Sequence, residues 1–119
     1  LLPDDAAALR AQLLRLADGR QVNLILTTGG TGFSPRDVTP EATLAVADRN
    51  APGIAEALRY HSLSITPRGM LSRGVSVLRG KTLIVNLPGS PKAVGEYLLP
   101  VLEHGLRIAA GLDGECART

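Results

Sequence analysis

The sequence has few of the residues on which several common kinds of binding site depend. Among its 119 residues there is one cysteine, Cys116, no tryptophan, and three aromatic side chains in all. A single cysteine forms neither an intramolecular disulfide nor a cysteine metal cluster, which suits a reducing, cytoplasmic setting. The net charge is only +2, so we expect no nucleic-acid surface, which would need a basic stripe and stacking aromatic rings.

Long hydrophobic runs are also missing. Charged residues or glycine interrupt every apolar stretch within about ten residues, whereas a membrane-spanning helix needs roughly 20 apolar residues. We therefore expect no membrane span. Hydrophobic residues make up 45% of the chain and charged residues 20%, proportions that are ordinary for one globular domain.

Helical and strand-like periodicities alternate along the chain. Helices are predicted over residues 4–17, 42–49, 54–62 and 94–110, buried strands over 22–27 and 82–87, and a weaker strand over 72–78. The tail over residues 112–119 has no periodicity, which leaves residues 1–111 as the domain. This alternation indicates a three-layer α/β fold with helices on both faces of a mostly parallel sheet.

Two of the predicted strands lead into glycine-containing loops, GGTG at residues 29–32 and PGSPK at residues 88–92. In such sheets ligands bind beyond the carboxyl ends of the strands. Glycines let backbone amides approach a phosphate, and the start of the following helix adds favourable partial charge. Either loop alone is equally well explained by tight packing, and GGTG matches neither the dinucleotide nor the P-loop pattern. The two loops together favour a small anionic ligand.

Two acidic residues flank this predicted ligand site. Asp37 follows the first glycine loop, where its carboxylate either pairs with Arg36 at the surface or faces a metal-phosphate group. Asp4 stands before the first predicted helix and is most simply an N-terminal cap.

Three motifs then occur in order: GGTGFSPRDVTPE at residues 29–41, MLSRGVSVLRG at 70–80 and NLPGSPK at 86–92. With the opening LPDD, they closely resemble the molybdopterin adenylyltransferase family, including the homologous domain of gephyrin and of its plant counterpart. The resemblance extends from residue 1 to about residue 111, with the motifs at the family's spacing. It implies the fold of molybdenum cofactor biosynthesis proteins.

The resemblance also implies an activity: adenylylation of molybdopterin with Mg-ATP, which releases pyrophosphate. Members are typically homotrimers, and their product passes to a molybdate-insertion protein. Asp37 and Asp4 would organise Mg²⁺ and the attacking phosphate, which makes Asp4 a site residue rather than a plain cap. The other residues that the resemblance assigns to the pterin, its phosphate or the nucleotide are Thr28, Gly29, Gly30, Thr31, Gly32, Ser72, Arg73, Pro88, Gly89, Ser90 and Lys92.

Family members begin with a strand and a helix that have no counterpart here, so we expect these 119 residues to be a portion of a longer protein. Two other functions stay open. One is a molybdopterin-binding module without adenylyltransferase activity, and the other is a generic nucleotide- or phosphate-binding α/β domain. The presence of both Asp4 and Asp37 favours the enzyme.

Overall fold

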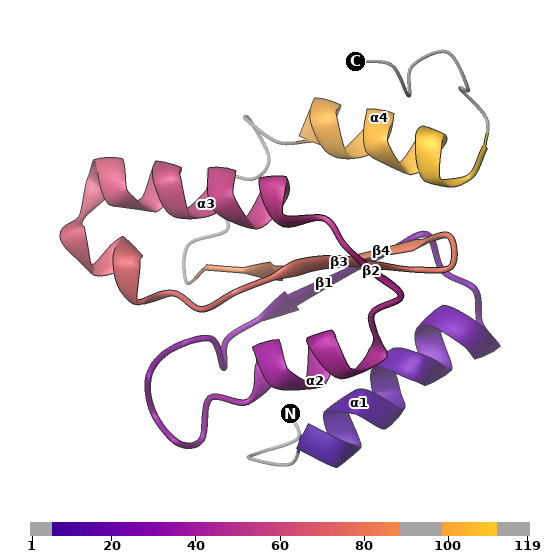
Figure 1. The fold of residues 1–119 in the computed structure, drawn as a ribbon, viewed down its shortest axis with the longest axis horizontal. Coiled ribbons are helices and arrows are strands. Elements are labelled where there is room, and N and C mark those ends of the chain that lie inside the picture. Colours follow the sequence, from indigo (N-terminus) through magenta and orange to yellow (C-terminus); the bar gives the residue numbers. More distant parts are fainter. Residues whose placement is uncertain (1–5, 89–98, 112–119) are drawn as a thin grey trace.

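The computed structural model describes residues 6–88 and 99–111. At its centre is a four-stranded sheet with helices above and below it (Figure 1). The strands are β1 (Leu24–Thr28), β2 (Arg49–Asn50), β3 (Ser76–Arg79) and β4 (Thr82–Leu87). Their order in the sheet is β1-β4-β3-β2; β1 runs parallel to β4, and β3 is antiparallel to both of its neighbours.

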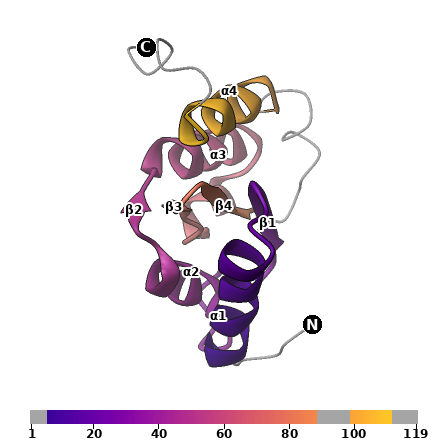
Figure 2. The same ribbon diagram turned by 90° about the vertical axis from the view of Figure 1, so that its right-hand side faces the viewer.

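Among the described residues, two helices cover each face of the sheet (Figure 2). α1 (Ala6–Leu14), which continues as a π-helical turn over Arg15–Gly19, lies with α2 (Thr39–Val46) on one face. α3 (Pro52–Ile65) and α4 (Leu99–Ala109) lie on the other, and a 3₁₀ turn, η2 (Pro67–Leu71), follows α3. The predicted α/β class with helices on both faces is confirmed.

The expectation of a mostly parallel sheet needs a correction, because the described sheet is mixed. One of its strand pairs is parallel and two are antiparallel. The cause is the connection from β3 to β4, which consists of Gly80 and Lys81 alone. A link this short permits a hairpin but not the crossover that parallel strands require. Gly80 has a φ of 56°, a value that hairpin turns of this length favour.

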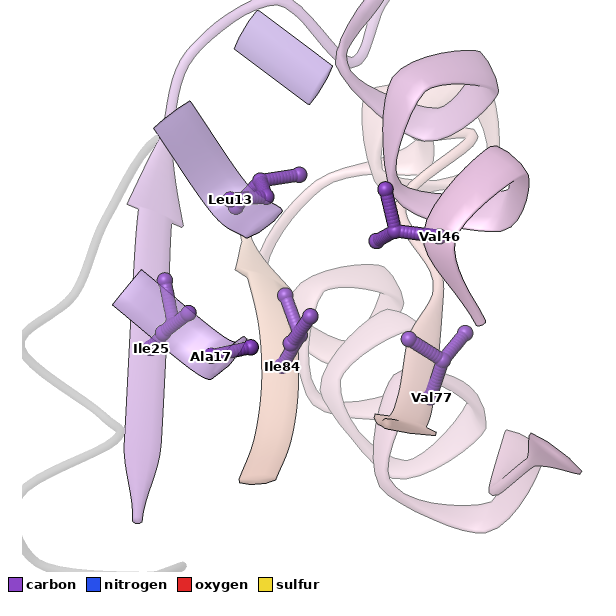
Figure 3. Close-up of a cluster of buried hydrophobic side chains, with 6 residues drawn as sticks. All are labelled: Leu13, Ala17, Ile25, Val46, Val77 and Ile84. Atoms are coloured by element: carbon purple, nitrogen blue, oxygen red, sulfur yellow. The ribbon is translucent and has the colours of Figure 1, made fainter. Parts of the chain in front are cut away.

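β4 lies at the centre of the core, and all of its residues are buried. On one face, Leu83, Val85 and Leu87 pack against Leu58 of α3 and Leu102 of α4. The cluster on the other face, shown in Figure 3, consists of Leu13, Ala17, Ile25, Val46, Val77 and Ile84. Burial from both sides explains why this strand reads as a nearly continuous apolar run.

The helix predicted over residues 42–49 is wrong at its end. α2 stops at Val46, and Arg49–Asn50 forms β2, which pairs with Leu78 and Val77 of β3. Both residues of β2 are exposed. A two-residue exposed strand has no apolar alternation, so no pattern in the sequence could indicate it.

The other predicted elements agree with the structure within a few residues. The strand predicted over residues 22–27 is β1, the helix over 54–62 lies inside α3, and the strand over 82–87 coincides with β4. The weaker strand predicted over 72–78 narrows to β3. Residues 4, 5 and 94–98 of the predicted helices lie outside the described residues. None of the described helices has the length and apolar character needed to cross a bilayer.

Candidate active site

β1 and β4 end side by side, so the loops that follow them begin at the same edge of the sheet. In the parallel register Thr28 pairs with Leu87, and each is the last residue of its strand. Thr28 leads into the glycine loop, residues 29–32, and Leu87 leads into Pro88. The strand ends that carry the two predicted loops therefore lie side by side, and residues 89–92 of the second loop lie outside the described residues.

The glycine loop turns sharply and passes close to the start of α2. Gly29 and Gly30 have φ values of 82° and 72°, in the left-handed region that favours glycine. A Cβ on Gly30 would lie 2.2 Å from Oγ1 of Thr39. The backbone N–H of Thr39 donates to the carbonyl of Gly30 at 3.1 Å. Glycine is thus needed for the turn, and its bare backbone leaves this edge open to an anion.

Asp37 is half-buried and folds back over the same loop. Its Oδ2 accepts a hydrogen bond from the backbone N–H of Ser34 at 3.0 Å, and its own N–H donates to the Ser34 carbonyl at 2.9 Å. A Cβ on Gly32 would lie 2.8 Å from that same Oδ2. The carboxylate therefore occupies the space that a side chain at position 32 would fill. A carboxylate has lone pairs for further partners, so Asp37 can keep this hydrogen bond and also bind a hard cation.

Arg73 joins the glycine loop to α2. Its Nε donates to the carbonyl of Gly32 at 2.7 Å, and its Nη2 donates to the carbonyl of Asp37 at 2.6 Å. Its Nη1 donates to Oε2 of Glu41 at 2.5 Å. This hydrogen bond lowers the pKa of Glu41 and raises the pKa of Arg73. Arg73 lies at the predicted site, and its guanidinium is engaged by groups of the protein itself.

Glu41 is a site neighbour that the sequence prediction omitted. It lies in the first turn of α2, and half of its side chain is exposed. The signal that could have found it is its place as the last residue of the first motif, residues 29–41.

A cavity of about 270 Å³ adjoins this edge of the sheet and brings together three predicted residues, Thr31, Ser72 and Pro88. The rest of its wall comes from the end of α3 and from η2, and comprises Ser62, Ile65, Thr66, Arg68 and Gly69. These residues were missed because they precede the second motif, at residues 70–80, and form no recognisable pattern of their own.

Four predicted site residues, Asp4, Gly89, Ser90 and Lys92, lie outside the described residues, and their roles stay predictions. Within residues 6–88 and 99–111, no three side chains of His, Cys, Asp or Glu form a group that could hold a metal ion. Of the two predicted metal ligands, Asp37 is the one whose surroundings are described.

The chain matches a model of the family described as "Probable molybdopterin binding domain" over residues 1–107. It is 52% identical over 98 residues to the molybdopterin adenylyltransferase of Escherichia coli (strain K12), in a match covering 82% of this chain and 50% of that protein. It is 45% identical over 109 residues to gephyrin of Dictyostelium discoideum, in a match covering 89% and 15%. The chain thus spans half the length, or less, of these curated relatives.

Solved structures agree with the sequence relatives. The molybdopterin biosynthesis enzyme MoaB from Thermus thermophilus superposes with a TM-score of 0.80 at 50% identity, covering 91% of this chain and 70% of that one. The fold implied by the three motifs is thereby confirmed. The chain belongs to the molybdopterin-binding domain family of molybdenum cofactor biosynthesis.

Proposed function

We propose that the protein adenylylates molybdopterin with Mg-ATP, giving adenylyl-molybdopterin and pyrophosphate, in the synthesis of the molybdenum cofactor. The observation that carries this proposal is the meeting of the glycine loop, Asp37 and Ser72 at the carboxyl edge of β1 and β4. This arrangement occurs in a chain that is 52% identical to a molybdopterin adenylyltransferase.

The reaction joins two anionic groups. An oxygen of the molybdopterin phosphate attacks the α-phosphorus of ATP, the bond from that phosphorus to the β-phosphate oxygen breaks, and pyrophosphate leaves with the electron pair. Catalysis of this kind depends on positioning and charge stabilisation more than on covalent chemistry by the protein. The backbone of Gly29 and Gly30 would contact phosphate oxygens, and the cavity beside Thr31 and Ser72 would hold part of the substrate.

Magnesium fits the chemistry of Asp37, whose carboxylate offers hard oxygen donors next to the space above Gly32. When bound, Mg²⁺ would neutralise phosphate charge. Asp37 would hold it together with Asp4, and the phosphates would supply further oxygen ligands. Gly89, Ser90, Lys92 and the neighbouring Pro88 would contact the nucleotide.

Four further features of the proposal rest on the family resemblance and on the sequence. The protein would act as a homotrimer and would pass its product to a molybdate-insertion protein. With one cysteine it would work in the reducing cytoplasm. Residues 1–111 would form the domain and residues 112–119 a polar tail.

The second candidate is a molybdopterin-binding module that does not transfer the adenylyl group. It is favoured by the description of the matching family, which names binding and not transfer. A generic nucleotide-binding domain is the third candidate, and it would not need the pterin.

The test uses the full-length protein with Mg-ATP and molybdopterin and detects adenylyl-molybdopterin and pyrophosphate by mass spectrometry. Asp37→Asn should keep pterin binding, measured by calorimetry, and lose about 100-fold or more of the turnover, because it removes a charged ligand at the reacting phosphates. Binding without product would favour the binding module. Absence of pterin binding by the folded protein would contradict both family functions.

A further inference from the structure

Arg73 attaches the segment from Gly32 to Asp37 to the rest of the domain. Inside the segment, Ser34 forms hydrogen bonds with the backbone N–H of Arg36 and with Asp37. Its centre is exposed, and 68% of Phe33 is accessible to solvent. Arg73 contacts both ends of the segment, through the carbonyls of Gly32 and Asp37, from a position 41 and 36 residues away along the chain.

The guanidinium group suits this attachment. Its planar fork holds three acceptors at once, and hydrogen bonds from a charged donor are stronger than those from a neutral one. The carboxylate of Glu41 accepts from Nη1 at 2.5 Å and from Nη2 at 3.4 Å. Glu41 thus orients the guanidinium toward the two carbonyls and balances its charge. A lysine at position 73 would offer a single ammonium group, which cannot reproduce the fork.

We propose that Arg73 and Glu41 are positioning residues that hold the segment from Gly32 to Asp37 in place and so keep the Asp37 carboxylate at the reaction site. This role differs from that of a ligand-binding arginine, because every nitrogen of the guanidinium already donates to the loop or to Glu41. The role in catalysis rests on the proposed function, whereas the attachment itself does not.

The chain supplies a matched control at the opposite end of the sheet. Arg79 donates through Nε and Nη2 to the two carboxylate oxygens of Asp18 at 2.9 and 2.7 Å, and through Nη1 to the carbonyl of Val46 at 2.9 Å. The exposed fractions of the two pairs are similar, 27% and 53% for Arg79 and Asp18 against 34% and 55% for Arg73 and Glu41. Asp18→Asn therefore measures the general effect of losing such a pair.

The first test is amide hydrogen exchange in the full-length protein without substrates. The amides of Ser34 and Asp37 should exchange roughly three- to tenfold faster in Arg73→Gln, because the local opening of the segment becomes more frequent. Glu41→Gln should give a smaller increase, and the double variant should match Arg73→Gln, since Glu41 acts through Arg73. Asp18→Asn should leave both amides unchanged.

Unchanged exchange at Ser34 and Asp37 in Arg73→Gln would overturn the proposal, as would a double variant whose effect is the sum of the two single effects. Should Arg73→Gln fail to fold, Glu41→Gln decides the matter, because it leaves Arg73 in place and removes only the carboxylate that orients its guanidinium. Unchanged exchange at Ser34 and Asp37 in Glu41→Gln would then overturn the proposal.

The second test is steady-state kinetics. Glu41→Gln and Arg73→Lys should lower kcat about tenfold or more and change the KM for molybdopterin less than about threefold, because they displace a catalytic group rather than remove a substrate contact. A rise in KM with unchanged kcat would assign Arg73 to substrate binding and refute the positioning role. A wild-type protein without transferase activity would contradict the proposed function, and the exchange comparison would still decide whether Arg73 holds the loop.

Discussion

The ideal Cβ position of Gly32 lies 2.8 Å from Oδ2 of Asp37, closer than a real Cβ approaches such an atom. Glycine at position 32 therefore leaves the space that the Asp37 carboxylate occupies. Since this oxygen is the far end of a side chain, it can move aside without unfolding the loop. A side chain added at position 32 would therefore displace the carboxylate that we assign to catalysis.

Gly32→Ala should consequently impair catalysis more than folding. We expect turnover to fall about tenfold or more, because the carboxylate must move aside and even a small misplacement of a catalytic group slows the reaction. The midpoint of urea unfolding should change little. The comparison is with Gly53→Ala, where an added Cβ meets nothing within 4 Å. A variant that lost stability and activity in parallel would show that the loop, and not Asp37 alone, has to move.

Asn86 should prove structural although it belongs to the third motif. It is buried, its Oδ1 accepts from the N–H of Val75 at 3.0 Å, and its Nδ2 donates to the hydroxyls of Thr27 and Thr43 at 2.9 and 3.1 Å. Asn86→Ala leaves these three groups without their partner, which should lower the free energy of unfolding by roughly 2 kcal/mol or more. Urea unfolding measures the change.

The exposed Asn23 provides the comparison for that experiment, because Asn23→Ala removes the same side chain from a site open to water. Equal losses of stability in the two variants would show that the hydrogen bonds of Asn86 contribute nothing of their own.

The ion pair between Asp18 and Arg79 should make stability depend on pH in the acid range. The hydrogen bond from Arg79 lowers the pKa of Asp18 below its usual value of 3.8. A carboxyl group with a lowered pKa stabilises the fold above its unfolded-state pKa, and the contribution disappears as the pH falls through its folded-state value. Wild type and Asp18→Asn should therefore differ in urea midpoint at neutral pH. The difference should shrink once the pH falls below the usual pKa of Asp18 and vanish below its lowered folded-state pKa.

Asp48 also faces Arg79, at 3.9 Å, so the comparison is repeated in the Asp48→Asn background. Because the pair is largely exposed, added salt should narrow the difference at neutral pH. A difference that persisted unchanged in acid would mean that Asp18 stabilises the fold by something other than its charge.

The sequence predicted those parts of the fold that have a strong local signal. β4 coincides with its prediction because burial on both faces leaves a continuous apolar run. The short β2 was missed because its two residues are placed by pairing with β3 and not by any preference of their own. The mixed direction of the sheet follows from the two-residue connection of Gly80 and Lys81, because a link this short joins antiparallel strands and its effect depends on how the two strands pair.

For the candidate site, too, features with a local sequence signal could be predicted, and features that depend on the tertiary fold could not. The glycine loop and Asp37 could be proposed as site residues because they lie close together in the sequence, directly after a predicted strand. The structure places them at one edge of the sheet. The partnership of Arg73 with Glu41 could not, since it joins positions 32 residues apart through side chains whose directions depend on the tertiary fold. Motif membership made Arg73 a candidate site residue, but it could not distinguish a ligand contact from a support for the loop.

The parallel pairing of β1 with β4 also links ligand affinity to folding. The two strands are 59 positions apart where Thr27 meets Asn86, so the site exists only when the whole intervening segment has closed on itself. A ligand that contacts both loops must then favour the folded state, and the melting temperature must rise with its concentration. Variants weakened in α2 or α3, far from any phosphate, would accordingly recover function in excess substrate, and apparent binding defects would arise from residues that never touch it.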